Sequence, residues 1–566
     1  MDILFVDTFI KKESYNFPVG INILSTIVNT TSDYTSEVIS FCNLIIDKEL
    51  PVDILFENNY ETIVNYILNK NPKIISFYTL QNSYFISLIV AKNIKEKNKN
   101  IKIILAGPQA SLCSLETLKT FDFVDLIAIG EGENNVISII DYFNNKENIE
   151  NVKGICYKKS NKIICNSPSP LVEDLDKLPI LKLNEDTLPN RLNIETGRGC
   201  PYNCTFCSTS IFWKHKVRTK SLDRLITEVK YYVTNYNINN FSFIHDLFTA
   251  RKQHVLEFCN KLIDSELNIK WICSARADTI DEEMISLMAR AGCNRVTLGI
   301  ETGSQRMQKK INKNLNMSKV KDIITLVNKY NINMLIGIIY GFPQEEEEDL
   351  LQTIDLVRFC IEEISIKDML IQKCMPYCGT HIYNTNKDNL VFNEDNFIID
   401  KYPAKQQADF IKCYPNIFSS FYLIDNEILK KYFYLDAFLK HVYQYSVFVL
   451  PKTTKEILTY YEDNLLNFYL AYETQIKKIV PLLTRIYFDD ELSLSKVMFN
   501  SLEDFIKTRM DDEFIEQLFK FEVEMVRASH RKNNKDSKIL TFDYDMLAYF
   551  EQQKKKKAKC KLLFDI

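Results

Sequence analysis

Three cysteines dominate the chemistry that this sequence can support. Cys200, Cys204 and Cys207 are separated by three and by two residues, and no fourth cysteine lies nearby. Three thiolates can hold a [4Fe–4S] cluster and leave one iron open to a small molecule, whereas a cluster that only transfers electrons is normally closed by four cysteines. The spacing therefore predicts an iron–sulfur cluster with one open coordination position.

Zinc is the alternative occupant of this triplet. A structural zinc site needs four ligands, and His215 is the one local side chain that could supply the fourth. The other cysteines are scattered singly, and an odd total of 15 favours reduced thiols over a disulfide framework. Cys374 and Cys378 flank an expected turn, but we interpret them, like most of the others, as small buried side chains.

The cysteine loop begins a run of six strand–helix repeats over residues 191–385. The expected strands are residues 191–196, 240–244, 270–273, 294–298, 333–336 and 369–372. Polar or glycine-rich residues follow each strand, which is where a β/α barrel builds its site. Six repeats predict a partial barrel that is open on one side.

Residues 1–145 repeat the same alternation with four continuous apolar runs. The expected strands are residues 3–6, 74–78, 101–105 and 126–129. Such runs separated by helices predict a doubly wound parallel sheet, whose ligands bind at the carboxyl ends of the strands. Gly107, Gly130 and Gly132 lie at these ends, so we predict that they line a ligand site; plain tight turns are the alternative.

The remaining segments complete an α/β protein of three domains. Residues 146–190 read as a connector that contains a hairpin and several prolines. Residues 386–566 contain no glycine and many apolar helical windows, which predicts a mostly helical domain ending in a strand at residues 538–542. We expect this last domain to select the substrate.

Composition excludes some classes of partner. The net charge is −4 without a basic stripe, so we expect no nucleic-acid partner. No apolar stretch is long enough to span a bilayer, and the acidic start of the chain with its short apolar run argues against a signal peptide. The sequence therefore predicts a cytoplasmic protein.

The loop at residues 199–207 resembles the signature of radical S-adenosylmethionine (SAM) enzymes. Further motifs follow the order seen in the subclass that carries an N-terminal cobalamin-binding domain. These motifs are residues 130–133, 198–201, 245–246, 276–278, 299–304, 341–343 and 376–380. The resemblance covers residues 1–385, and together the motifs are specific although each one after the cysteines is weak alone.

The resemblance implies a [4Fe–4S] cluster, SAM and cobalamin as cofactors. In this family an electron from a donor such as flavodoxin or ferredoxin lets the cluster cleave SAM to a 5′-deoxyadenosyl radical, which abstracts hydrogen from an unactivated C–H bond. Many members of the subclass then move a methyl group from SAM through cobalamin to carbon or phosphorus. The cobalt-binding motif Asp-x-His-x-x-Gly is absent and no histidine precedes His215, so no N-terminal imidazole can bind cobalt.

The family roles carry over to particular residues of this chain. The three cysteines would hold the cluster, Phe206 would lie near the adenine, and Gly341 would let the backbone approach the adenine. Asp246, Arg276 and Glu301 would meet the amino group, carboxylate and ribose of SAM. The alternative for these three charged residues is ion pairing at the rim of the barrel.

Three functions follow, in descending order of support from the sequence. The first is a cobalamin-dependent radical SAM enzyme that methylates an unactivated carbon. The second keeps the radical but transfers no methyl group, and instead catalyses oxidative cyclisation, rearrangement or C–C bond formation. The third is a non-catalytic, metal-containing interaction protein. The sequence indicates a small-molecule or peptide substrate without identifying it.

Overall fold

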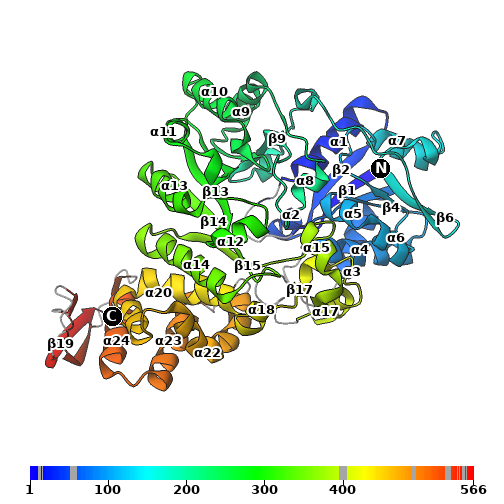
Figure 1. The fold of residues 1–566 in the computed structure, drawn as a ribbon. Helices are drawn as coiled ribbons and strands as arrows, with labels where there is room; N and C mark the ends of the chain where they lie inside the picture. The colour runs from blue at the N-terminus through cyan, green and yellow to red at the C-terminus, as the bar shows by residue number, and fades with distance from the viewer. Residues whose placement is uncertain are drawn as a thin grey trace.

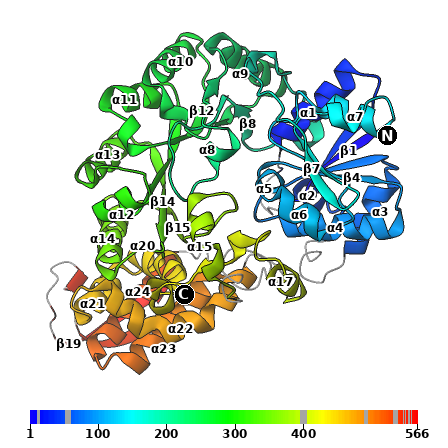
Figure 2. The same ribbon diagram turned by 45° about the vertical axis from the view of Figure 1, so that its right-hand side comes forward.

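The chain folds into an N-terminal α/β sheet, an open barrel and a helical C-terminal region, drawn in blue to cyan, green and yellow to red in Figure 1. The N-terminal sheet and the C-terminal helices contact different sides of the barrel (Figures 1 and 2). The computed structural model describes residues 1–9, 15, 17–50, 60–393, 405–486, 493–529, 537–544, 546, 549–550, 555 and 557–565.

The N-terminal sheet has seven strands in the order β2-β1-β3-β4-β5-β6-β7. Neighbouring strands from β2 to β5 pair in parallel, and β6 and β7 add an antiparallel hairpin at one edge. The strands are β1 (Ile3–Asp7), β2 (Ser36–Ser40), β3 (Ile74–Tyr78), β4 (Lys102–Ala106), β5 (Leu126–Ala128), β6 (Ile155–Lys159) and β7 (Lys162–Cys165). The predicted doubly wound parallel sheet is confirmed, and the hairpin of the expected connector extends it.

Both faces of this sheet are buried, which explains the continuous apolar runs. Ile3 and Phe5 belong to the core shared with helices α1 and α7, whereas Leu4 and Val6 belong to the core shared with α3 and α4. These helices are α1 (Val19–Thr31), α3 (Tyr60–Asn69), α4 (Tyr84–Lys97) and α7 (Val136–Phe143). Helices cover both faces of the sheet, and the edge formed by the carboxyl ends of the strands faces the barrel.

One expectation about the cysteines is wrong. Cys156 and Cys165 form a disulfide, and they lie directly opposite each other on the antiparallel strands β6 and β7. Their Cα atoms are 4.1 Å apart, which brings the two sulfur atoms within bonding reach. An odd cysteine count gives no information about pairs that strand register creates.

The barrel sheet has six parallel strands in the order β15-β14-β13-β12-β11-β8. Among the described residues β8 and β15 do not pair with each other, so the predicted partial, open barrel is confirmed. The strands are β8 (Leu192–Glu195), β11 (Asn240–Ile244), β12 (Lys270–Ala275), β13 (Cys293–Glu301), β14 (Asn333–Tyr340) and β15 (Asp368–Lys373). The helices that cover the barrel are α9 (Leu222–Tyr236), α10 (Lys252–Asp264), α11 (Glu282–Arg290), α13 (Met317–Lys329) and α14 (Glu347–Arg358).

The C-terminal region packs against two different parts of the molecule. Its first part, around helix α17 (Lys405–Lys412), packs on the N-terminal domain, where Phe418 contacts Tyr84 and Phe421 contacts Phe85. The later helices share one apolar core with the barrel. They are α18 (Glu427–Lys431), α19 (Leu435–Ala437), α20 (Gln444–Val449), α21 (Pro451–Tyr460), α22 (Leu465–Ile486), α23 (Leu494–Arg509) and α24 (Glu513–Ser529), followed by the hairpin β18 (Ser537–Tyr544) and β19 (Lys557–Asp565). The expected mostly helical character is confirmed.

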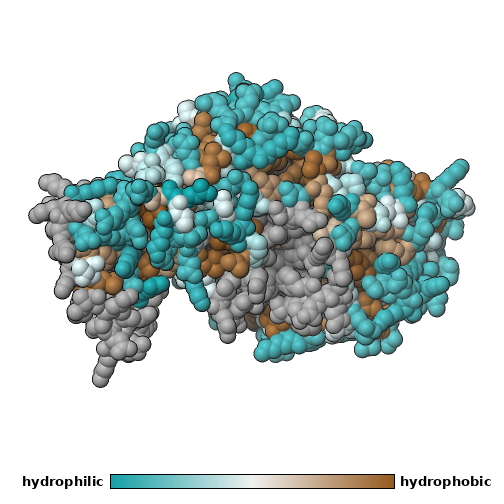
Figure 3. Space-filling model, turned by 90° about the horizontal axis from the view of Figure 1, so that it is seen from below, coloured by the Kyte–Doolittle hydropathy of each residue, from teal (hydrophilic) through white to brown (hydrophobic). Residues whose placement is uncertain are grey.

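The surface in Figure 3 is largely hydrophilic at its outer parts, with hydrophobic side chains in the middle of that face. Leu370 and Ile244, on barrel strands β15 and β11, are large apolar residues that remain 43% and 40% exposed. Within the described ranges, no helix has the length and apolar character needed to cross a membrane.

Candidate active site

The cysteine loop is held by backbone contacts that need glycine. It follows β8 and the short strand β9 (Gly197–Arg198), which pairs with β10 (Arg218–Thr219). Gly199 has a φ of +94°, and a Cβ at this position would lie 1.9 Å from the carbonyl oxygen of Lys216. Only glycine fits such a close approach of two backbones, so the start of the loop is tightly placed.

All three cysteines of the triplet are half-buried in this loop. Burial raises the pKa of the Cys200 and Cys204 thiols, and for Cys204 the neighbouring cations Lys313 and Arg276 act in the opposite direction. His215, the fourth ligand of the zinc alternative, is exposed. In the part of the chain that is described, no three His, Cys, Asp or Glu side chains gather closely enough to surround a single metal ion.

Arg276, at the end of β12, fixes the loop from the barrel side. Its guanidinium binds both carboxylate oxygens of Asp278 at 2.8 and 2.9 Å and stacks 3.8 Å from the ring centre of Tyr202. It also donates to the Lys313 carbonyl, and its Nη1 lies 3.9 Å from the Cys204 sulfur. Arg276 therefore positions the loop and places positive charge beside a candidate cluster ligand.

Glu301 lies inside the barrel with a φ of +73°, which is rare for a residue other than glycine. Its carboxylate pairs with Lys313 at 2.7 Å, and both side chains are largely buried. A Cβ on Gly299 would lie 2.4 Å from Glu301 Oε1, and one on Gly337 would lie 3.7 Å from Oε2. Two glycines on paired strands thus make room for this ion pair. Lys313 belongs to no recognisable motif, so the sequence does not predict it as a site residue.

Phe206 and Gly341 lie on the apolar side of the loop. The Phe206 ring is 6.0 Å from that of Phe342 and packs against a small buried apolar cluster. Gly341 has a φ of +78°, and a Cβ there would lie 2.4 Å from Leu429 Cδ2 of α18. The need for glycine at this position therefore comes from Leu429, and the adenine contact of Phe206 and Gly341 stays a prediction.

Glu345 is a buried acid whose role no sequence pattern predicts. Its carboxylate accepts hydrogen bonds from the backbone N–H groups of Gly341 and Phe342. Burial raises the pKa of this carboxyl to about 8, although the two N–H groups act in the opposite direction. Glu345 therefore closes the turn that follows β14 and remains largely protonated at neutral pH.

His245 and Asp246 end strand β11 beside the cysteine loop. Asp246 Oδ2 accepts a hydrogen bond from the Gly199 N–H at 2.7 Å, and burial raises the pKa of the Asp246 carboxyl. The His245 ring lies against Gly197, and burial lowers its pKa to about 4, which keeps it neutral. Asp246 thus binds the cysteine loop directly, and the rest of its side chain is exposed.

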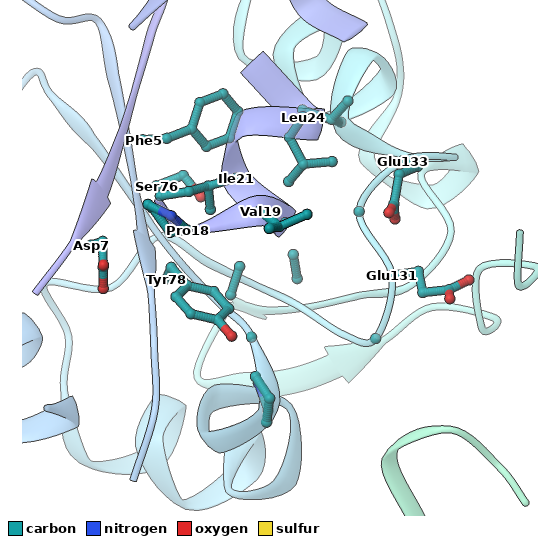
Figure 4. Close-up of a pocket in the computed structure, with 18 of the residues that line it drawn as sticks. Phe5, Asp7, Pro18, Val19, Ile21, Leu24, Ser76, Tyr78, Glu131 and Glu133 are labelled. Atoms are coloured by element: carbon teal, nitrogen blue, oxygen red, sulfur yellow. The ribbon is translucent and has the colours of Figure 1, made fainter. Parts of the chain in front are cut away.

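A cavity of about 420 Å³ opens at the carboxyl ends of the N-terminal strands and faces the barrel. Gly107, Gly130 and Gly132 all lie in its wall, and a Cβ on Gly130 would meet nothing within 4 Å. Figure 4 shows Phe5, Ile21, Leu24 and Val19 on the apolar side and Glu131 and Glu133 on another side. From the barrel, the cavity is lined by Asn193, Glu195, Arg198, Phe212, Trp213 and Ile244.

A family comparison decides the chemistry of the cysteine loop. The profile of the radical SAM superfamily matches residues 194–357, which include the cysteine triplet and the barrel strands from β11 to β14. Residues 194–357 of this chain form a radical SAM domain. Membership in that superfamily means that it uses a [4Fe–4S] cluster and SAM, which agrees with the three-cysteine spacing and argues against the zinc and non-catalytic alternatives.

Individual relatives are similar to this chain over more residues than the family profile covers. An uncharacterized methyltransferase of Pyrococcus horikoshii is 27% identical over 374 residues, which cover 65% of this chain and 77% of that protein. The anaerobic magnesium-protoporphyrin IX monomethyl ester cyclase of Rubrivivax gelatinosus is 28% identical over 47% of this chain, and the match spans 50% of the cyclase. Both matches leave part of the radical SAM enzyme without a counterpart.

A solved structure shares the whole architecture of the radical SAM enzyme. The cobalamin-dependent SAM radical enzyme OxsB, with aqua-cobalamin bound, superposes with a TM-score of 0.59. The match covers 94% of this chain and 82% of OxsB at 15% sequence identity. The common fold therefore includes the N-terminal sheet, the open barrel and the C-terminal helices.

Proposed function

We propose that this radical SAM enzyme methylates an unactivated carbon of its substrate with the help of cobalamin bound at the N-terminal domain. The observation that carries this proposal is the cavity at the carboxyl ends of the N-terminal strands, which faces the cysteine loop. In parallel α/β sheets this edge is where ligands bind. The names of the methyltransferase relative and of cobalamin-dependent OxsB support the same assignment.

The wall of the cavity fits a large ligand with apolar edges. Phe5, Ile21 and Leu24 present apolar side chains between α1 and the sheet, and Gly130 leaves the backbone open to close approach. Gly107 has a φ of +101°, and its missing side chain spares a contact of 2.9 Å with Thr79. A concave, mostly apolar wall with a few polar groups is typical of cofactor sites.

The residues around the cluster loop have complementary roles in this proposal. When bound, the cluster supplies the electron that cleaves SAM, and cobalamin supplies a carrier for its methyl group. Asp246 offers a carboxylate to the amino group of SAM, and Arg276 and Lys313 place positive charge near Cys204, where the carboxylate of SAM needs it. In this proposal Glu301 binds the ribose hydroxyls and Phe206 contacts the adenine face.

The partners of the reaction belong to the same proposal. An external electron donor such as flavodoxin or ferredoxin reduces the cluster, and the substrate is a small molecule or peptide that enters the open barrel. Asn426 donates to the Gly341 carbonyl at 2.8 Å, so the start of α18 touches the loop after β14. This contact supports a role for the C-terminal region in shaping the substrate site.

A second reaction class is favoured by one relative. The cyclase of Rubrivivax gelatinosus shares 28% identity over residues that include about half of this chain. By analogy, the radical would then serve ring closure, rearrangement or C–C bond formation without transfer of a methyl group. The two reactions use the same cluster but release different products from SAM.

An anaerobic product assay distinguishes these functions. The protein is purified without oxygen, and its iron, sulfide and cobalamin contents are measured before incubation with SAM and dithionite. We expect bound cobalamin, together with both S-adenosylhomocysteine and 5′-deoxyadenosine. 5′-Deoxyadenosine without S-adenosylhomocysteine would instead support the second reaction class. Absence of cobalamin after reconstitution with hydroxocobalamin would overturn the proposal.

A further inference from the structure

A buried charge network joins the N-terminal domain to the cysteine loop. Arg198 Nη1 binds Glu131 at 2.7 Å and Nη2 binds Glu133 at 2.6 Å, while Nε binds Glu195 at 2.8 Å. The side chains of Arg198 and Glu131 are only 4% and 2% exposed. Three carboxylates therefore bind one guanidinium, and this arginine lies two residues before the first cysteine of the triplet.

Glu131 also connects this guanidinium to a second one. Arg218 binds Glu131 at 2.8 Å through Nη2 and at 3.0 Å through Nη1, and it donates to the Val172 carbonyl at 2.6 Å. Val172 in turn donates its backbone N–H to Glu131 at 2.6 Å. One carboxylate thus ties together the N-terminal domain, the connector and both strands of the β9–β10 pair that carries the cysteine loop.

The position of this network is between the two cofactor sites. Glu131 and Glu133 lie at one side of the cavity, in the loop after β5 (Figure 4). Arg198 lies in the wall of the same cavity and begins the cysteine loop. Ion pairs with directional geometry therefore link the wall of the cavity to the start of the cysteine loop.

We infer that Glu131 and Arg198 are positioning residues that set the spacing and angle between cobalamin and the cluster. This inference rests on the proposed function. Transfer of a methyl group from SAM needs both cofactors in register, because a displacement of about 1 Å can cost about 10²-fold in rate. Formation of 5′-deoxyadenosine needs only the cluster and SAM. A change in this network therefore uncouples the two products.

The test compares E131Q and E133Q with the control E228Q. Glu228 is equally buried and pairs with Lys220 at 2.8 Å, on helix α9 away from the cavity wall. Each full-length protein is reconstituted with iron, sulfide and hydroxocobalamin. Cofactor content, the electron spin coupling between cob(II)alamin and the reduced cluster, and the ratio of S-adenosylhomocysteine to 5′-deoxyadenosine are then measured without added substrate.

We expect E131Q to retain the cluster, to change the spin coupling and to lower the product ratio by roughly tenfold. E133Q loses one contact instead of several, so it should change the spin coupling and the product ratio less. E228Q should leave the spin coupling and the product ratio unchanged. An unaltered coupling and ratio in a fully loaded E131Q would overturn the inference, as would an equal change in E228Q. A wild-type protein that binds no cobalamin would overturn the proposed function itself, which separates the two failures.

Discussion

The barrel is joined to its two neighbours by different physical means. Toward the N-terminal domain the junction is polar: it contains the ion pairs of Arg198 and an open cavity of about 420 Å³. Toward the C-terminal helices the junction is a continuous apolar core, in which one ion pair, Lys373 with Asp436 at 2.8 Å, is almost completely buried. The barrel thus has one junction that keeps an open cavity and one junction that is closely packed.

The N-terminal junction is suited to positioning cofactors, and the C-terminal junction is suited to stabilising the barrel. A close-packed apolar interface is stable and leaves no room, whereas a site for large cofactors needs open volume and directional contacts to define it. Forked ion pairs supply that direction without filling the cavity. The N-terminal junction is therefore where we expect substitutions to alter chemistry, and the C-terminal junction is where we expect them to alter stability.

The largest effect is expected at the cysteine loop, next to the polar junction. Cys204→Ala removes one of three cluster ligands, so iron binding and 5′-deoxyadenosine formation should fall below detection. Cys413→Ala, which changes an exposed thiol, is the control and should retain both. Measurement of iron, sulfide and product after anaerobic reconstitution checks this. A full iron content in the Cys204 variant would contradict the assignment.

A large stability effect is expected at the apolar junction. Asp436→Asn leaves the buried ammonium of Lys373 without its counter-charge, and loss of one partner of such a pair costs about 3–5 kcal/mol. Urea unfolding should detect this loss. The ratio of the two SAM-derived products from the folded fraction should stay as in the wild type. A changed ratio would show that the two junctions are not functionally separate.

A smaller effect on chemistry is expected from Arg276→Lys. Lysine keeps the positive charge but loses the fork to Asp278 and the N–H that lies 3.9 Å from the Cys204 sulfur. Contacts around metal ligands typically change activity by about 10–100-fold, and we expect the lower end of this range because the charge remains. The rate of 5′-deoxyadenosine formation and the cluster reduction potential measure the effect. Unchanged values would limit Arg276 to a role in folding.

The smallest effect is expected from the ionisation of Glu345. It should make the free energy of unfolding depend on pH. Its pKa rises from 4.5 to about 8 on folding, so the protonated acid favours the folded state. Its stabilising contribution is complete below about pH 4.5 and is lost as the pH rises through 8, with a slope of at most about 1.4 kcal/mol per pH unit.

Glu345→Gln keeps an acceptor for the Gly341 and Phe342 N–H groups but cannot ionise. The stability of this variant should decline less between pH 6 and 8 than that of the wild type. Urea unfolding at both pH values measures the difference. An identical decline in both proteins would mean that Glu345 ionises freely in the folded state.

Much of the fold could be read from local sequence patterns. All six barrel strands and four strands of the N-terminal sheet were predicted, because continuous apolar runs fit strands buried on both faces. Strand β2 was missed, since Ser36–Ser40 contains only two apolar residues and pairs at the edge of the sheet. Residues 454–472 are one of the apolar windows that predict a helix in the C-terminal region, but the helix is interrupted between α21 and α22, where Glu462 and Asp463 have positive φ values.

The C-terminal region shows where such patterns stop being informative. The sequence predicts one helical domain over residues 386–566, but the part that contains Phe418 and Phe421 packs on the N-terminal domain, while the later helices pack on the barrel. Amphipathic periodicity identifies the buried face of a helix. It does not identify the surface against which that face packs.

The sequence by itself determined the cysteine triplet, the family and the order of the repeats, because these depend on residues that are close along the chain. Only the tertiary structure decided that Lys313 neutralises Glu301 and that Glu131 holds Arg198, which lies 67 residues further along the chain. Charges separated by such distances in sequence leave no local pattern. The pairing of Glu131 with Arg198 follows from the way in which the two sheets meet, whereas Lys313 reaches Glu301 inside the barrel. The meeting of the sheets also places the cavity opposite the cysteine loop.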